Sequence, residues 1–167
     1  GALARATEAA NAAYLGSPDE ALMNSSFADP MEFLSRWLVD ALPDGDDGLT
    51  RLVHGRLHVE HAIFHRTQPS VAAIVGWRDA ALGHPGADLA LLALPYATRD
   101  DQALPPRYRG HAGRDDLASI GVPTEQEFID RYVERCGLFS VREHLDYYTA
   151  HACFRLAATL HRLDRFA

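Results

Sequence analysis

Two neighbouring stretches in the middle of the chain decide the fold: residues 52–64, LVHGRLHVEHAIF, and residues 74–90, IVGWRDAALGHPGADLA. Short runs rich in β-branched and other apolar residues predict strands at 50–54, 62–65 and 71–77. The polar segment RTQPS, between the last two runs, is typical of a turn and joins them into a hairpin. We therefore expect a small β element at the centre of the chain.

Helical patterns surround this centre. Alanine-rich or apolar composition and 3.6-residue spacing predict five helices, at 2–14, from 29 to about 42, and at 86–94, 123–137 and 141–165. The second helix begins at Asp29-Pro30 in the manner of an N-cap and a first helical residue. The apolar residues that share one face of it, and are expected to face the core, are Phe33, Leu34, Trp37, Leu38 and Leu42.

The predicted fold class is mainly α with a small β-hairpin, and 167 residues suit a single domain spanning 1–167. Within it, residues 1–48 form a helical lead-in and residues 49–96 hold the central loops and strands. Residues 117–167 form a helical end. The stretch 97–116 carries several Arg, Asp, Gly and Pro residues, which indicate an exposed loop.

Composition excludes several classes of protein. A net charge of −7 argues against general nucleic-acid binding, which requires a basic face. No apolar run approaches the roughly 20 residues needed to cross a membrane, and the N-terminus lacks the layout of a signal peptide. Cys136 and Cys153 have no metal-binding spacing, so we expect reduced, partly buried thiols in a cytoplasmic protein.

The central stretches resemble a known family. Residues 52–64 resemble the catalytic loop of aminoglycoside phosphotransferases and choline-kinase-like enzymes, V-H-G-D-x-x-x-x-N-x-I/L, and residues 74–90 resemble their metal-binding strand and following helix, I-D-W-E-x-A-x-x-G-D-P-x-x-D-L-A. The Leu-Pro-Tyr of 94–96 and the Gly-x-Pro-[ST]-x-x-x-[FY] pattern of 121–128 resemble the kinase-like domains attached to acyl-CoA dehydrogenases. The resemblance covers about residues 30–165 and implies the C-terminal lobe of a protein-kinase-like fold.

The residues that carry chemistry in that family are replaced here. Arg56 stands where the family has the aspartate that orients and helps deprotonate the attacking hydroxyl, and His61 where it has an asparagine ligand for Mg²⁺. Gly76 replaces the strand aspartate that holds Mg²⁺, and Arg78 replaces an acidic residue two positions on. Phosphoryl transfer depends mostly on positioning and on electrostatics around Mg²⁺. The resemblance therefore implies a catalytically degenerate, pseudokinase-like protein that binds no metal and no cofactor.

The structural frame of the family is retained. His54 is expected to be a core histidine of the loop, and the family aspartate that matches Asp88 braces the catalytic loop by hydrogen bonds. Kinases of this type also need an N-terminal lobe with a lysine. The roughly 49 residues before the catalytic loop read as helices and contain no lysine. We therefore expect this lobe to stand without an N-lobe.

Two other interpretations concern the cluster of His54, His58, His61 and His65. Their spacings suit a metal site on a helix face, but a loop followed by a strand would scatter them, so no metal site is predicted. Alternatively, the altered cleft performs acid–base chemistry. Its acid–base side chains would then be His58, Glu60 and His61. Arg56 and Arg78 would bind an anionic substrate.

Three functions follow from these observations. The first is a degenerate relative of the phosphotransferases that binds an anionic small molecule or a partner protein. The second is a repurposed enzyme with lyase- or isomerase-type chemistry, and the third is a fragment of a small-molecule phosphotransferase. An apolar surface where the N-lobe would sit favours a homodimer, while no nucleic acid and no membrane is expected as a partner.

Asp79 is expected to pair with an arginine.

Overall fold

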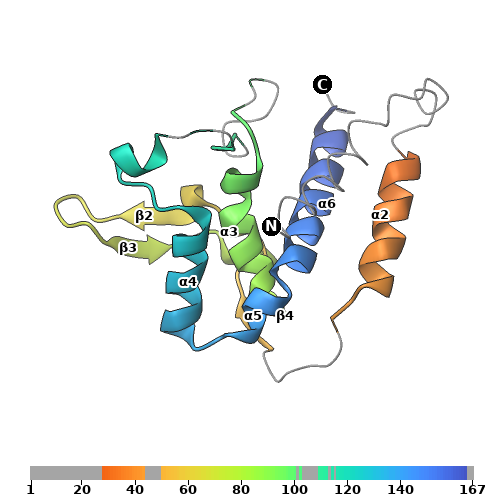
Figure 1. The fold of residues 1–167 in the computed structure, drawn as a ribbon, viewed down its shortest axis with the longest axis horizontal. Coiled ribbons are helices and arrows are strands. Elements are labelled where there is room, and N and C mark those ends of the chain that lie inside the picture. Colours follow the sequence, from red (N-terminus) through yellow and green to blue (C-terminus); the bar gives the residue numbers. More distant parts are fainter. Residues whose placement is uncertain are drawn as a thin grey trace. The chain divides into compact units, whose positions relative to one another are not determined.

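The structure is a computed structural model that describes residues 28–43, 50–100, 102, 109–112, 114 and 116–164. The helix predicted at 2–14 and most of the loop predicted at 97–116 lie outside these residues. The chain divides into two compact units, one formed by residues 46–143 and the other by residues 1–45 with 144–167. Figure 1 labels the helices and strands of both units and colours them by their position in the sequence.

The core of the first unit is helical. Its α-helices are α3 (Gly86–Ala97), α4 (Glu125–Cys136) and the short α5 (Ser140–Glu143), and the 3-10 helix η4 (Leu117–Ile120) precedes α4. Helix α3 packs against α4, and each contributes fully or nearly fully buried side chains, including Leu89 from α3 and Val133 from α4. The helices predicted at 86–94 and 123–137 are therefore confirmed.

The ends of α4 follow from local sequence. The hydroxyl of Thr124 accepts a hydrogen bond from the backbone N–H of Glu127 at 3.2 Å, and the Glu127 carboxylate accepts one from the N–H of Thr124 at 2.8 Å. This reciprocal pair satisfies two amide groups that the first turn of a helix leaves without partners. At the other end Gly137 adopts a left-handed conformation, with φ +66°, that ends the helix.

Two antiparallel strand pairs complete this unit. Strand β1 (Arg51–Val53) pairs with β4 (Ala81–Gly83), and β2 (Ala62–Phe64) pairs with β3 (Val71–Ile74) as the predicted hairpin. Strand β4 was not predicted, because Ala-Leu-Gly contains no β-branched residue and its partner lies about thirty positions earlier in the chain. The 3-10 helices η1 (Val59–His61) and η2 (Trp77–Asp79) flank the hairpin.

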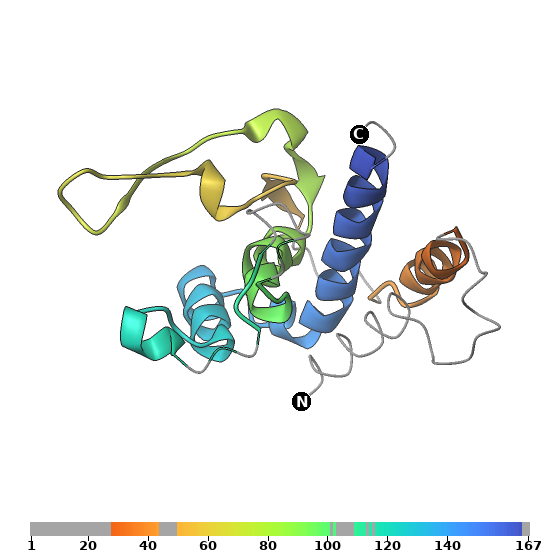
Figure 2. The same ribbon diagram turned by 90° about the horizontal axis from the view of Figure 1, so that it is seen from above.

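The β2–β3 hairpin is exposed along almost its whole length. Every residue from 63 to 79 is exposed, and the tip of the hairpin reaches beyond the helices of its unit (Figure 2). The large apolar side chains among these exposed residues are Ile63, Phe64, Val71, Ile74, Val75 and Trp77. We call this set the apolar hairpin surface.

The other unit pairs two helices. Helix α2 (Ala28–Asp40) packs against α6 (Leu145–Asp164), where the hydroxyl of Tyr147 donates to the carbonyl of Leu38 at 3.1 Å. Leu38 is buried, but Phe33 is 66% exposed and Trp37 and Leu42 are also exposed. The prediction that the whole apolar face of this helix meets a core is therefore wrong. Because α2 packs against α6, its buried residues are those that face α6, and the rest of its apolar face stays exposed.

The last predicted helix is two helices. The structure ends α5 at Glu143 and begins α6 at Leu145, so the single helix predicted at 141–165 is wrong in this detail. No proline or glycine marks the break. Of the two thiols, both free, Cys136 is exposed and not partly buried as predicted, while burial raises the pKa of Cys153 to about 11. None of the described helices combines the length and apolar character of a membrane span.

Candidate functional site

The site begins in the loop that follows β1. The carboxylate of Asp88, near the start of α3, accepts hydrogen bonds from the backbone N–H groups of His54 and Gly55, the latter at 2.9 Å. All of these groups are buried or half-buried. The positive end of the α3 dipole also favours an acidic side chain in this first turn. Asp88 thus connects the loop after β1 to helix α3 through two hydrogen bonds.

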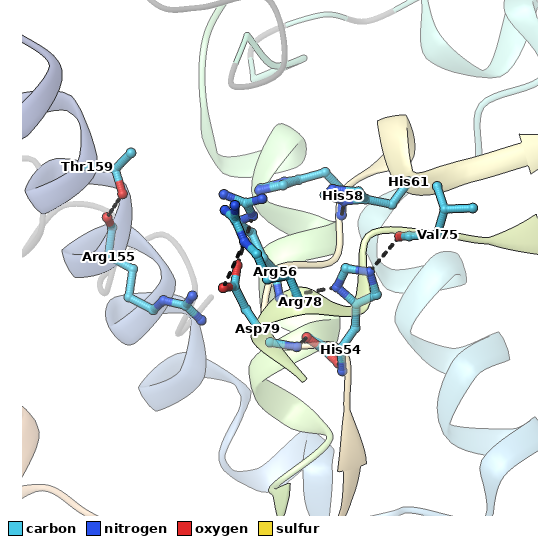
Figure 3. Close-up of polar contacts among 11 residues, drawn as sticks. His54, Arg56, His58, His61, Val75, Arg78, Asp79, Arg155 and Thr159 are labelled. Atoms are coloured by element: carbon cyan, nitrogen blue, oxygen red, sulfur yellow. Dashed lines mark hydrogen bonds and ion pairs between the residues drawn. The ribbon is translucent and has the colours of Figure 1, made fainter. Parts of the chain in front are cut away.

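The imidazole of His54 joins the loop to the end of the hairpin. Its Nδ1 accepts from the backbone N–H of Arg56 at 3.3 Å, and its Nε2 lies 2.9 Å from the carbonyl oxygen of Val75 (Figure 3). A carbonyl only accepts, so Nε2 is the donor in this contact. The Trp77 ring lies 5.0 Å away. The His54 side chain is therefore buried, and both of its ring nitrogens contact backbone groups.

A close backbone approach places Arg56 beside an acid. Gly55 has φ +79°, and a Cβ atom there would lie 2.1 Å from the carbonyl oxygen of Asp79, so only glycine fits. The next residue, Arg56, then places its Nε 3.2 Å from Oδ2 of Asp79. Arg78 places its Nε 3.9 Å from Oδ1 of the same carboxylate. The predicted pairing of Asp79 with an arginine is confirmed, and it involves two.

Gly76 and His61, the two positions that match Mg²⁺ ligands in the family resemblance, lie against each other. Gly76 adopts φ +87°, and a Cβ atom there would lie 2.5 Å from Cδ2 and 2.9 Å from Nε2 of His61. Real Cβ atoms do not approach other atoms this closely. The imidazole therefore occupies the space that any side chain at position 76 would need. The backbone N–H of His58 lies 3.4 Å from Nδ1 of the same ring.

The structure gathers the predicted site residues around two centres. Arg56 and Arg78 meet at Asp79. The ring of His61 lies 4.9 Å from that of His54 and 6.0 Å from that of His58. His65 lies apart in the hairpin turn, where its Nδ1 accepts from Thr67. In the described part of the chain, no three His, Cys, Asp or Glu side chains are grouped so that they could hold a metal ion.

Sequence reasoning gave Asp79 only a minor role. The structure shows that it is the acid shared by both arginines, and the signal for this was its position directly after Arg78. The contact of His61 with Gly76 gave no signal in the sequence. It depends on a left-handed backbone at position 76 and on the 3-10 turn that carries His61.

Comparison with known proteins identifies the family. Residues 1–125 match the family model described as the phosphotransferase enzyme family. The chain belongs to this family. It is similar to acyl-CoA dehydrogenase family member 10 of Mus musculus, with 33% identity over 130 residues, which are 78% of this chain and 12% of the relative. It is also 33% identical to member 11 of Rattus norvegicus over 127 residues, 76% of this chain and 16% of that protein.

The fold has a counterpart among solved structures. A protein of Ralstonia eutropha, solved as a candidate aminoglycoside phosphotransferase, aligns with a TM-score of 0.58 at 22% identity. The alignment covers 94% of this chain and 55% of that protein. This member of the phosphotransferase family therefore has a kinase-like fold with helices and small antiparallel sheets. It spans less than a fifth of the acyl-CoA dehydrogenase relatives that it matches.

Loss of the Asp88 carboxylate is expected to loosen this site. Asp88→Asn should lower the free energy of unfolding by about 1–3 kcal/mol, because an amide group cannot accept from both buried N–H groups. Urea denaturation measures the loss. Asp130→Asn, which removes a half-exposed ion pair with Arg142 in the same unit, should cost at most about 1 kcal/mol. Equal losses in the two variants would contradict the bracing role.

The contact of His61 with Gly76 predicts a coupling between the two positions. Gly76→Ala should destabilise more than Gly121→Ala, since Gly121 has a similar φ of +77° but nothing within 4 Å of the added Cβ. In a His61→Ala background this excess, about 1–3 kcal/mol, should disappear because the ring is gone. A double-mutant cycle in urea tests this. An excess that survives removal of the ring would show that backbone strain alone is responsible.

Proposed function

We propose that this chain is a degenerate member of the phosphotransferase family that transfers no phosphoryl group and acts as a ligand- or protein-binding module. The observation that carries the proposal is the imidazole of His61 packed into the space beside Gly76. In the family resemblance, these two positions supply Mg²⁺ with an amide and a carboxylate oxygen. Here one position has no side chain, and the other fills the resulting space with a ring.

The residues present do not fit Mg²⁺. This ion prefers several oxygen ligands at about 2.0–2.1 Å in octahedral geometry. Asp79 is the carboxylate that the structure brings to the site, and it already faces the guanidinium groups of Arg56 and Arg78. A divalent cation there would meet two like charges. Arg56 also occupies the position of the family's catalytic aspartate, and it cannot accept a proton from a substrate hydroxyl.

The proposal also treats the chain as the C-terminal lobe of a kinase-like fold. In support, 94% of this chain aligns with only 55% of the Ralstonia protein. Retention of the frame residues His54 and Asp88, both buried and hydrogen-bonded, supports a fold kept for a purpose other than catalysis. Binding is such a purpose, because it needs a stable surface but no metal site.

The apolar hairpin surface supports a role in protein binding. Large groups of exposed apolar side chains mark interaction sites on soluble proteins, and a two-stranded hairpin is only marginally stable without cover. We propose that a second copy of the chain covers this surface. Strands β2 and β3 contain no charged residue and no proline, and such residues are the usual means of blocking association at a strand edge.

Titration with Mg-ATP tests the loss of phosphotransfer. No rise in melting temperature and no saturable calorimetric signal are expected for the chain with Mg-ATP or Mg²⁺. The matched variant combines His61→Asn with Gly76→Asp. It regains two oxygen ligands without the steric conflict, and it should bind Mg²⁺ more tightly than the unaltered chain. Saturable Mg-ATP binding by the unaltered chain, with transfer of phosphate to any acceptor, would overturn the proposal.

Sedimentation velocity over a concentration series tests self-association. The chain is expected to sediment as a dimer, and Phe64→Asp should convert it to a monomer because a charge would be buried in the contact. Val39→Asp is the control, since Val39 is also an exposed apolar residue but lies on α2, outside the hairpin. A monomer at every concentration, or equal effects of the two substitutions, would count against the dimer.

A further inference from the structure

Within the described part of the chain, the acids paired with the site do not neutralise all of its positive charge. Arg56 and Arg78 both approach Asp79, so two guanidinium groups share one carboxylate. Among the residues that the structure describes, no other acid and no carbonyl pairs with either side chain. The surrounding segment 54–79 has three arginines against two acidic residues, although the whole chain carries a net charge of −7. The excess of positive charge is therefore confined to this segment.

The geometry leaves most guanidinium donors open. In each pair the nitrogen nearest to the carboxylate is Nε, at 3.2 Å for Arg56 and 3.9 Å for Arg78. Neither contact has the geometry of a hydrogen bond, and Nε of Arg56 is a buried nitrogen without a hydrogen-bond partner. An arginine has five N–H donors in a fixed fork that matches two oxygens of one anion. The terminal nitrogens of both side chains remain for such a ligand.

The site is accessible but partly shielded. The side chain of Arg56 is 40% exposed and that of Arg78 is 79% exposed, and Figure 3 shows both near Asp79 with His58 and His61 nearby. His58 is buried and His61 half-buried, so part of the surroundings excludes water. Charge-assisted hydrogen bonds are stronger where water is partly excluded. A small charged ligand can therefore reach the two guanidinium groups, and its interaction with them is only partly screened by water.

We propose that Arg56 and Arg78 bind a small oxyanion, a carboxylate or a phosphate, with their terminal nitrogens. The two guanidinium groups share one carboxylate, so the anion supplies the second negative charge. It also lies between the two positive charges and reduces their repulsion. The proposal rests on the proposed function, since it assigns a ligand class to the cleft of a degenerate phosphotransferase relative. The place that matches a cation site in the family then takes an anion.

Calorimetric titration at constant ionic strength tests the site, with inorganic phosphate and succinate as probes and chloride as the reference. Saturable binding is expected for at least one probe, and the one that binds decides between phosphate and carboxylate. Arg56→Gln and Arg78→Gln should each weaken binding about tenfold or more, because each removes charge-assisted hydrogen bonds. Arg78 is largely exposed, so its variant keeps the fold if the Arg56 variant does not.

Two controls separate this site from general attraction of anions. Arg142→Gln removes an exposed arginine paired with Asp130 in the same unit and should leave binding unchanged. Asp79→Asn removes the competing carboxylate and should tighten binding severalfold. Absence of saturable binding by either probe, or equal weakening by Arg142→Gln and Arg78→Gln, would overturn the proposal. Such a result without Mg-ATP binding would leave the proposed function standing, while Mg-ATP binding would overturn the proposed function itself.

Discussion

The carboxylate of Asp88 holds two consecutive backbone N–H groups, and the geometry of the site depends on that attachment. The two amides belong to the turn after β1, and the acid belongs to the most buried helix of the unit. The turn is therefore fixed to the core at one point. From there Gly55 meets the backbone of Asp79, and the ring of His54 reaches the carbonyl of Val75. Two segments more than twenty residues apart are joined without any catalytic group taking part.

Under the proposed function, this frame explains how the residues at the catalytic positions can differ from those of the family while the fold persists. The interactions that hold the loop use backbone atoms and the side chains of His54 and Asp88. Arg56 contributes its backbone N–H to this network, whereas its side chain points to Asp79. A residue that donates only its main chain to the frame can be replaced at modest structural cost. The chemistry and the scaffold are thus carried by different atoms of the same loop.

Much of the fold could be predicted because its signals are local. The hairpin follows from β-branched runs around a polar turn, and α4 from a capping residue at one end and a glycine at the other. Strand β4 and the break before α6 could not be predicted, since each lacks a local marker and depends on packing. The exposure of Phe33 has the same origin. Helical spacing shows which residues share a face but not how far a neighbouring helix reaches.

The site was predictable to the same extent. Matching motifs located His54, Asp88 and the replaced positions, and adjacency suggested a partner for Asp79. The packing of His61 beside Gly76 could not be predicted, because a left-handed backbone and a three-residue turn place them together. Spatial contacts between loops of irregular conformation leave no periodic pattern in a sequence.

The contact between His61 and Gly76 also makes substitutions at the two positions depend on each other. An aspartate introduced at position 76 meets the imidazole, so the substitution is unfavourable until position 61 has changed. A change at position 61 alone leaves a hollow beside a glycine, which costs packing and restores no ligand pair. Under the proposed function, neither single substitution restores a pair of metal ligands, so a chain that acquires the two ligands one at a time passes through a less stable protein.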